Sequence, residues 1–313
     1  EYKPSQKVKF ATLEATKPIE KLADRFKVLV AGKDKAADFY RKTFAGLFAY
    51  VSNRIPEITD ALYKIDDALR AGFGWEMGPF ETWDALGVQK GLELLKAEGK
   101  TAAAWVEEML AAGHTSFYKV SEQGVKQFYD IDSKSYKAIP GVENFIILDN
   151  LRATGKVLWK NAGASVVDLG DGILNVEFHS KMNSLGSDVI QGLLKGVELA
   201  EKDFRGLVVG NDAPNFSAGA NLGLVYMFAL DQEYDELNLM IAQFQQAMMR
   251  MRYSSIPVVG APHGLALGGG CELNLHCDKV VAAAETYMGL VEFGVGLIPA
   301  GGGTKEMTLR TAA

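Results

Sequence analysis

Two glycine-containing stretches, FSAGANL at 216–222 and PHGLALGGGCELNLHCD at 262–278, decide how the C-terminal half of the chain is expected to fold. Each follows strand-like apolar sequence, and each is followed by a helical pattern of apolar residues. Backbone N–H groups at the start of a helix have no partner within it and point outward. Two such turns aimed at one point would therefore supply two N–H donors to a single developing negative charge.

Two glutamates are close to these turns in the sequence. Glu272 comes two residues after the GGG run, in the first turn of the expected helix, and Glu292 lies in the apolar stretch MGLVEFGVGL. Burial among apolar groups raises the pKa of a carboxyl toward working pH, as catalytic acids and bases require. The structural alternative is that an acid in a first turn complements the helix dipole and that glycine runs only mark turns.

Three patterns of apolar residues divide the chain. Helical spacing predominates up to Ala112, short aromatic-rich strands are expected between Ser116 and Pro140, and strands alternate with helices from about Lys156. The last pattern is typical of βα units around a mostly parallel sheet. We therefore expect an α+β multidomain chain, with an all-α domain at 1–115, a short-strand connector at 116–155 and the domain of the glycine turns at 156–313.

Composition excludes several classes of protein. The 313 residues are 48% apolar, yet no apolar run is long enough to cross a membrane and no signal peptide is visible at the N-terminus. We expect an intracellular, cytoplasmic protein without a membrane span. A net charge of −6 argues against a nucleic acid partner.

The cysteines and histidines offer no obvious site of their own. Cys271 and Cys277 are flanked by apolar residues, so we expect packing roles and no disulfide. His263 and His276 lack metal-ligand spacing, so no metal site is predicted.

The C-terminal motifs resemble those of a known family. FSAGANL, PHGLALGGGCELNLHCD and MGLVEFGVGLIPAGGGT occur with the order and spacing of the enoyl-CoA hydratase/isomerase (crotonase) family, over roughly residues 160 to 313. The resemblance implies a ββα spiral domain and a coenzyme A thioester as substrate. It departs from many relatives at Asn221, where they carry Asp; the polar cap is kept and its charge is lost.

The resemblance also assigns roles to single residues. It places an oxyanion hole at the backbone N–H groups of Ala220 and Gly269, with substrate contacts at Ala218 and Gly268. Hydratases of the family carry two glutamates, at the positions of Glu272 and Glu292 here. By the resemblance, Glu272 activates the water that attacks Cβ and Glu292 exchanges the proton at Cα, so that trans-2-enoyl-CoA is hydrated to 3-hydroxyacyl-CoA.

The helical half contains RAGFGWEMGPFETWDALGV at 70–88, which resembles the C-terminal helical domain of 3-hydroxyacyl-CoA dehydrogenases. Such enzymes bind NAD in a Rossmann domain that precedes the helical one. Here no G-x-G-x-x-G follows a strand, and His114 is the first histidine of the chain and stands alone until residue 179. The dehydrogenase site and NAD are therefore expected in a longer parent, and no cofactor is expected in this piece.

Together the two halves resemble a bacterial multifunctional β-oxidation protein. We expect a fragment that starts within a helical domain and ends inside an incomplete crotonase domain, from a parent that forms a homo-oligomer or associates with a thiolase. Two alternatives stay open: a crotonase-family enoyl-CoA isomerase, which needs one carboxylate, and a catalytically silent acyl-CoA-binding or assembly module.

Other prominent residues have structural interpretations. Asn53 lies in an NR motif but is expected to be structural, and Trp75, Phe80 and Trp83 are expected to fill the helical core. The MMRMR run at 248–252 is expected on a solvated face, with contact to coenzyme A phosphates as the alternative.

Overall fold

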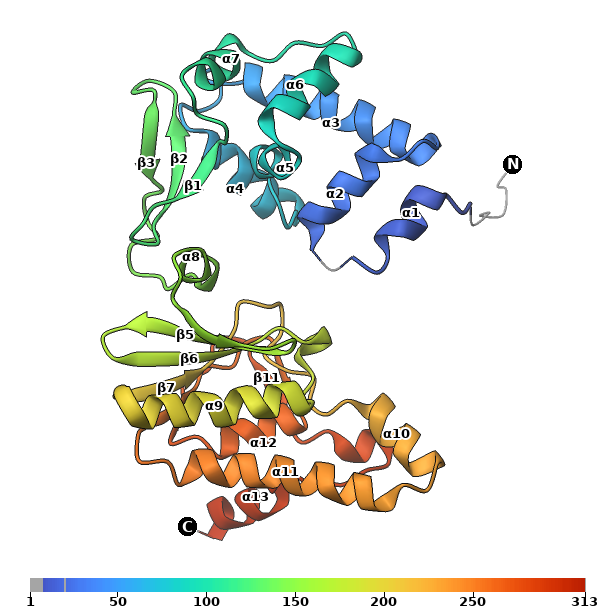
Figure 1. Cartoon of the computed structure of the whole chain (residues 1–313), viewed down its shortest axis with the longest axis vertical. Coiled ribbons are helices and arrows are strands. Elements are labelled where there is room, and N and C mark those ends of the chain that lie inside the picture. The colour runs from blue at the N-terminus through green and yellow to red at the C-terminus, as the bar shows by residue number, and fades with distance from the viewer. Residues whose placement is uncertain (1–7, 20, 313) are drawn as a thin grey trace. The chain divides into compact units, whose positions relative to one another are not determined.

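The computed structural model describes residues 8–19 and 21–312. The chain divides into two compact units, of which the first ends at Asn144 and the second begins at Phe145 (Figure 1). The mixture of helices and sheets confirms the predicted α+β class. The predicted boundaries at 115 and 155 differ from this division.

Unit 1 is helical at first and ends in a small sheet. Its described elements are α1 (Ala11–Thr16), α2 (Leu22–Ala31), α3 (Lys35–Asn53), α4 (Leu62–Phe73), α5 (Pro79–Leu86), α6 (Val88–Ala97), α7 (Ala104–Ala111), β1 (Tyr118–Val120), β2 (Lys126–Asp130) and β3 (Ser135–Ala138). The three strands form an antiparallel sheet in the order β1-β2-β3.

The small sheet, which the sequence patterns predicted as a short-strand connector after an all-α stretch, packs into the helical core of unit 1. Phe117, Phe128 and Tyr129 are buried in the same apolar cluster as the residues of α3 to α7. A three-stranded sheet of this size needs an apolar surface to cover one of its faces, and the helices supply it.

Stacked aromatic rings fill this core, as predicted for Phe80 and Trp83, which are fully buried. Trp83 stacks on Phe48 with ring centroids 4.7 Å apart, and its indole N–H donates to the Val88 carbonyl at 3.0 Å. The prediction was wrong for Trp75, which is 39% exposed. Asn53 has the expected structural contact, because its amide donates to the Ala49 carbonyl at 2.8 Å.

A buried carboxylate joins α4 to α5 and β1. Asp66 accepts hydrogen bonds from the N–H groups of Phe80 at 2.9 Å and Glu81 at 3.0 Å, and from the Tyr118 hydroxyl at 2.9 Å. It therefore caps α5 in place of Gly78, where a Cβ would lie 2.2 Å from the Asp66 Cβ. Burial raises the pKa of Asp66 to about 7, although these donors favour the charged form.

Unit 2 is built on a six-stranded sheet in the order β10-β8-β7-β6-β5-β4. Pairs from β4 to β6 are antiparallel, and those from β6 through β7 and β8 to β10 are parallel. The strands are β4 (Val157–Lys160), β5 (Ala164–Gly170), β6 (Ile173–Phe178), β7 (Gly206–Val209), β8 (Val258–Gly260) and β10 (Lys279–Val280). The predicted alternation of strands and helices is thus present, on a sheet that is parallel in its second half.

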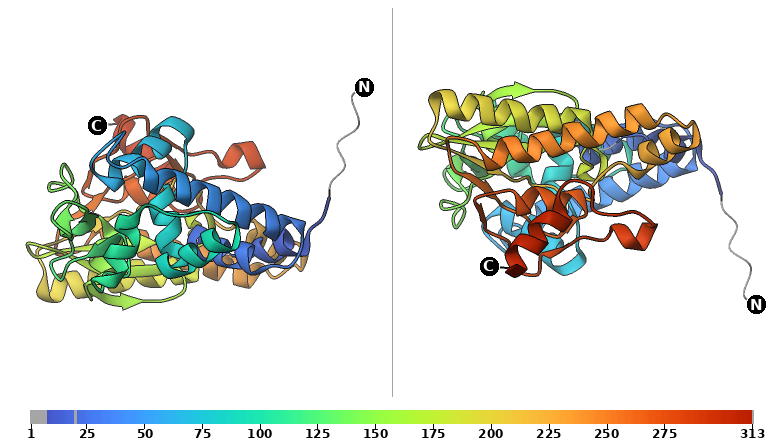
Figure 2. Two further views of the ribbon diagram at one scale, coloured as in Figure 1. Left: turned by 90° about the horizontal axis from the view of Figure 1, so that it is seen from above. Right: turned by 90° about the horizontal axis from the view of Figure 1, so that it is seen from below.

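Helices α9 (Ser187–Asp203) and α11 (Tyr234–Arg252) run side by side in unit 2 (Figure 2). The remaining described elements are α8 (Leu148–Ala153), η1 (Lys181–Asn183), α10 (Leu222–Leu230), β9 (Leu265–Leu267), α12 (Gly269–Leu275), β11 (Tyr287–Gly289), η2 (Glu292–Val295) and α13 (Gly303–Ala312). Strands β9 and β11 form a second, parallel pair. Among the helices of the described residues, none has the length and apolarity needed to cross a membrane.

Replacing Asp66 by Ala is expected to lower the free energy of unfolding of unit 1 by about 2–4 kcal/mol, because three buried donors lose their acceptor. Guanidinium unfolding followed by tryptophan fluorescence, to which the buried Trp83 contributes, measures this change.

Asp67→Ala is the matched control. Asp67 is exposed and pairs with Arg70 at 2.9 Å, so its loss is expected to change stability by less than about 0.5 kcal/mol. Equal losses for both variants would show that Asp66 does not cap α5.

Candidate active site

The two glycine turns of unit 2 lie against each other. Ser217, in the first turn, pairs with β9: its N–H donates to the Leu265 carbonyl at 3.0 Å, and its carbonyl accepts from the Leu267 N–H at 2.9 Å. Gly219 has a φ of 89°, and a Cβ there would lie 2.8 Å from the Leu267 oxygen and 3.2 Å from the Gly269 nitrogen. Glycine is required at this position by both conformation and space.

The N–H groups of Ala220 and Gly269 are the two donors predicted from the sequence, and the structure brings them together. Gly269 is the first residue of α12, after Gly268 with a φ of 51°. A Cβ on Gly269 would lie 3.7 Å from the Ala220 nitrogen. In the described part of the chain, neither N–H donates a hydrogen bond. Two unused donors thus lie next to each other at this point.

Glu272 lies in the first turn of α12, as predicted, and is only 2% exposed. Its Oε1 accepts a hydrogen bond of 2.8 Å from the N–H of Gly303, the first residue of α13. Burial raises the pKa of Glu272 above its ordinary value, and the nearby charge of Glu292 raises it further, against the opposing N–H of Gly303. A carboxylate with a raised pKa is a stronger base than an ordinary one.

Glu292 opens η2 and lies beside the second glycine turn. A Cβ on Gly268 would lie 3.1 Å from Glu292 Oε1. Its Oε2 is buried and has no hydrogen-bond partner among the described residues. A buried oxygen without a hydrogen bond lowers the stability of the fold. Hydrogen bonding to Oε2 therefore does not explain why this carboxylate is buried.

The two residues predicted to contact substrate are partly used within the fold. The Ala218 N–H donates to the Met182 carbonyl at 3.2 Å, and the Gly268 N–H donates to the Gly289 carbonyl at 2.9 Å. The Gly268 carbonyl also accepts from the Glu272 N–H at 2.9 Å, so the Ala218 carbonyl, the Ala218 methyl and the Gly268 α-carbon are left for a ligand.

The residues that enclose Glu272 were not predicted from the sequence. A Cβ on Gly301 would lie 2.2 Å from the Phe244 ring and 2.4 Å from Glu272 Oε2, so Gly301 admits both groups. The Phe244 ring, on α11, would also lie 3.3 Å from a Cβ on Gly269. Phe244 is one apolar position of an amphipathic helix, and its sequence carries no signal of a site.

Two further buried residues, His276 and Glu306, lie close to Glu272. His276 Nδ1 is 2.7 Å from the Glu272 carbonyl oxygen, and His276 Nε2 is 3.7 Å from Glu306 Oε1. Glu306 is also paired with Arg252 at 2.6 Å, and these charges lower its pKa despite burial. Within residues 8–19 and 21–312, no cluster of three or more His, Cys, Asp or Glu could hold a metal.

Cysteine and arginine neighbours have structural roles. Cys271 and Cys277 are buried free thiols, and burial raises their pKa values to about 11 and about 12, which disfavours the reactive thiolate.

The MMRMR run at 248–252, which was predicted to lie on a solvated face, is only partly exposed to solvent. Met248 and Met251 are buried, and Arg250 pairs with Glu201 at 2.8 Å.

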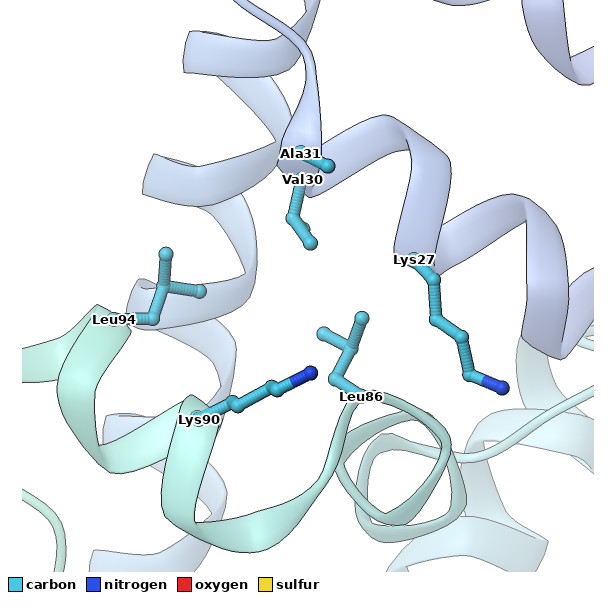
Figure 3. A pocket seen from close by; sticks show the side chains of 7 residues that line it. Lys27, Val30, Ala31, Leu86, Lys90 and Leu94 are labelled. Atoms are coloured by element: carbon cyan, nitrogen blue, oxygen red, sulfur yellow. The ribbon is translucent and has the colours of Figure 1, made fainter.

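A separate pocket of about 230 Å³ lies in unit 1, between α2, the end of α5 and α6 (Figure 3). Val30, Leu86 and Leu94 line it with Lys27 and Lys90. None of the residues predicted to form a site belongs to it.

Known proteins match both units. Residues 168–312 match the family model "Enoyl-CoA hydratase/isomerase", and residues 47–131 match "3-hydroxyacyl-CoA dehydrogenase, C-terminal domain". A "Probable 3-hydroxyacyl-CoA dehydrogenase" of Bacillus subtilis is 42% identical over 306 residues, which cover 98% of this chain and 38% of the relative. A "Putative fatty acid oxidation complex trifunctional enzyme" of Rickettsia felis is 31% identical over 266 residues, 84% of this chain and 33% of the relative.

The chain thus spans about a third of the length of these two relatives, 38% of one and 33% of the other. Among solved structures, an enoyl-CoA hydratase from a Polaromonas species is 25% identical, with a TM-score of 0.44 over 46% of this chain and 57% of that one.

Replacing Glu272 by Gln is expected to stabilise unit 2 increasingly as the pH rises. The folded-state pKa of Glu272 lies above its ordinary value of 4.5. Glu272 therefore costs the fold no stability below that value, and stability is lost as the pH rises through the folded-state pKa. Gln is neutral throughout and can still accept from Gly303. Thermal unfolding of both proteins between about pH 5 and about pH 8 measures the growing difference.

Glu198→Gln is the control for this titration, since Glu198 is exposed and pairs with Lys195 at 2.7 Å. A difference between wild type and Glu272→Gln that did not change with pH would contradict the raised pKa.

Proposed function

Since the chain belongs to the enoyl-CoA hydratase/isomerase family through residues 168–312 and carries a 3-hydroxyacyl-CoA dehydrogenase C-terminal domain at 47–131, we propose that it adds water to trans-2-enoyl-CoA. The observation that carries this proposal is the meeting of two carboxylates, Glu272 and Glu292, beside two unused N–H donors, Ala220 and Gly269. Hydration needs a group that takes a proton from water, one that gives a proton to carbon, and donors for the enolate oxygen.

The oxyanion donors act on the thioester. In the proposed reaction, the thioester oxygen accepts hydrogen bonds from the Ala220 and Gly269 N–H groups. Their stabilisation grows as negative charge moves onto that oxygen during attack at Cβ, so they favour the enolate-like transition state over the substrate.

The carboxylates move the protons. Glu272 takes a proton from water as the water oxygen bonds to Cβ, and Glu292 gives a proton to Cα as the enolate collapses, so the pair of carboxylates enters the reaction with one proton between them. The product gains one H and one OH, and the two glutamates have exchanged protonation states. Exchange of a proton through solvent restores the starting state. The raised pKa of Glu272 supports this role, because a stronger base takes the proton from water more readily.

The double-bond isomerase is the second candidate, because isomerisation needs one carboxylate to move a proton between carbons. The presence of two carboxylates, coupled through their charges, favours hydration. The third candidate is a catalytically silent module that binds acyl-CoA or serves in assembly.

The rest of the proposal concerns the longer proteins that this chain resembles. We propose that the chain works in fatty acid oxidation in the cytoplasm, within a protein whose NAD-dependent dehydrogenase module oxidises the 3-hydroxyacyl-CoA product. The trifunctional name of the Rickettsia felis relative supports a multienzyme assembly, for which a thiolase is the proposed partner.

Replacing either Glu272 or Glu292 by Gln is expected to lower kcat for crotonyl-CoA hydration by about 10²- to 10⁴-fold, because each removes a proton-transfer group. Loss of the enoyl absorbance measures hydration, and Glu285→Gln, an exposed glutamate, is the control.

The outcomes separate the three candidates. Full turnover by Glu272→Gln would remove that residue from the mechanism. Conversion of 3-enoyl-CoA to 2-enoyl-CoA without hydration would identify an isomerase, and binding without either reaction would identify a silent module.

Replacing Gly301 by Ala is expected to lower kcat for hydration by about 10²-fold, because a small misplacement of a catalytic group is sufficient for such a loss. The new Cβ would lie 2.4 Å from Glu272 Oε2, so the carboxylate has to move. Gly294→Ala is the control, since a Cβ there meets nothing within 4 Å. Unchanged turnover by Gly301→Ala would show that the position of Glu272 does not limit the reaction.

A further inference from the structure

We propose that the side chain of Ser217 is a positioning residue that fixes the Ala220 N–H relative to the Gly269 N–H. The inference rests on the proposed function, since it concerns how these two N–H groups polarise one thioester oxygen. Ser217 does not itself face the substrate: it is 0% exposed and acts through the backbone of the two turns.

The hydroxyl of Ser217 both donates and accepts a hydrogen bond. It donates to the Asn183 carbonyl at 2.7 Å and accepts from the Gly219 N–H at 3.1 Å. The second bond fixes the Ala218–Gly219 peptide, which directly precedes the peptide that carries the Ala220 N–H. Because Gly219 has a φ of 89° and no side chain, little else restrains this peptide against rotation.

The backbone of Ser217 joins the same turn to the strand that leads into the second one. It makes two hydrogen bonds with β9, to Leu265 and Leu267, directly before Gly268 and Gly269. On the opposite side, the Leu185 N–H donates to the Gly219 carbonyl at 2.9 Å. Both peptide groups of Gly219 are therefore held, one of them by the Ser217 hydroxyl.

The size of Ser217 is also fixed by the second turn. A Cβ on Gly270 would lie 2.9 Å from the Ser217 Cβ and 3.2 Å from its Oγ, so Ser217 packs on the first turn of α12. A larger side chain would push apart the two turns that carry the donors. Alanine would fit but would leave the buried Gly219 N–H without an acceptor, which favours rotation of that peptide.

Ser217→Ala is therefore expected to lower kcat for crotonyl-CoA hydration by about 10- to 100-fold while KM changes by less than about threefold. Ser217→Cys, which is slightly larger than Ser and keeps only a weak acceptor, is expected to lie between wild type and Ser217→Ala. Ser165→Ala is the matched control: Ser165 is also buried, but its hydroxyl bonds to His179 at 3.0 Å, and no loss is expected.

A second measurement does not depend on turnover. Butyryl-CoA labelled with ¹³C at the thioester carbonyl binds without reacting, and the infrared band of that carbonyl moves to lower frequency when two N–H groups polarise it. Wild type and Ser165→Ala are expected to show the full shift, Ser217→Cys a smaller one, and Ser217→Ala about half of it as one donor turns away.

The outcomes keep the two proposals apart. A wild-type protein that shifts the carbonyl band but hydrates nothing would refute the hydration proposal, and the infrared series would still test Ser217. An unchanged shift and kcat in folded Ser217→Ala would overturn the positioning role, as would a wild-type band no different from that of butyryl-CoA in water. If Ser217→Ala does not fold, as judged by circular dichroism, a wild-type shift in Ser217→Cys would overturn the role and a reduced one would support it.

Discussion

The contact between the two glycine turns is the constraint on which the candidate site depends. Side chains at Gly219 or Gly270 would meet backbone or Ser217 atoms at 3.2 Å or less, so the turns can approach only because these positions lack a Cβ. The approach places two N–H groups without partners next to each other, at the start of α12 and in the turn before α10. A helix start leaves N–H groups unused, as at Gly269, and the contact places the Ala220 N–H, just before the N-cap residue of α10, next to it.

Burial of Glu272 is the second consequence of this packing. The carboxylate lies beneath the 301–303 loop and the Phe244 ring, with one hydrogen bond from Gly303 and a like charge on Glu292 nearby. Such an arrangement is unfavourable for the ionised carboxylate, and an apolar residue at this position would be buried at a lower cost in free energy. A stability cost of this kind at a site with converging donors is typical of groups that transfer protons.

The buried carboxylates of unit 1 show that burial alone does not identify a site. Asp66 and Asp84 also have pKa values raised to about 7 by burial, yet each is saturated by hydrogen bonds from backbone N–H groups that it caps. Glu292 differs from them, because one of its buried oxygens has no partner among the described residues. The contrast lies in the partners of the oxygens, and only the tertiary structure reveals them.

The sequence by itself determined the helical and βα patterns and both glycine turns, because these depend on local spacing. The four residues of the candidate site were predicted from a family resemblance, which motifs contiguous in the chain carry. It did not determine that β1–β3 pack into the helical core, that Trp75 is exposed, or that Phe244, Gly301 and Ser217 shape the site. These are contacts between segments distant in sequence, and each of the residues involved has an ordinary local pattern. Periodicity predicts which face of an element is buried, whereas the identity of the partner that covers it is decided when the elements pack.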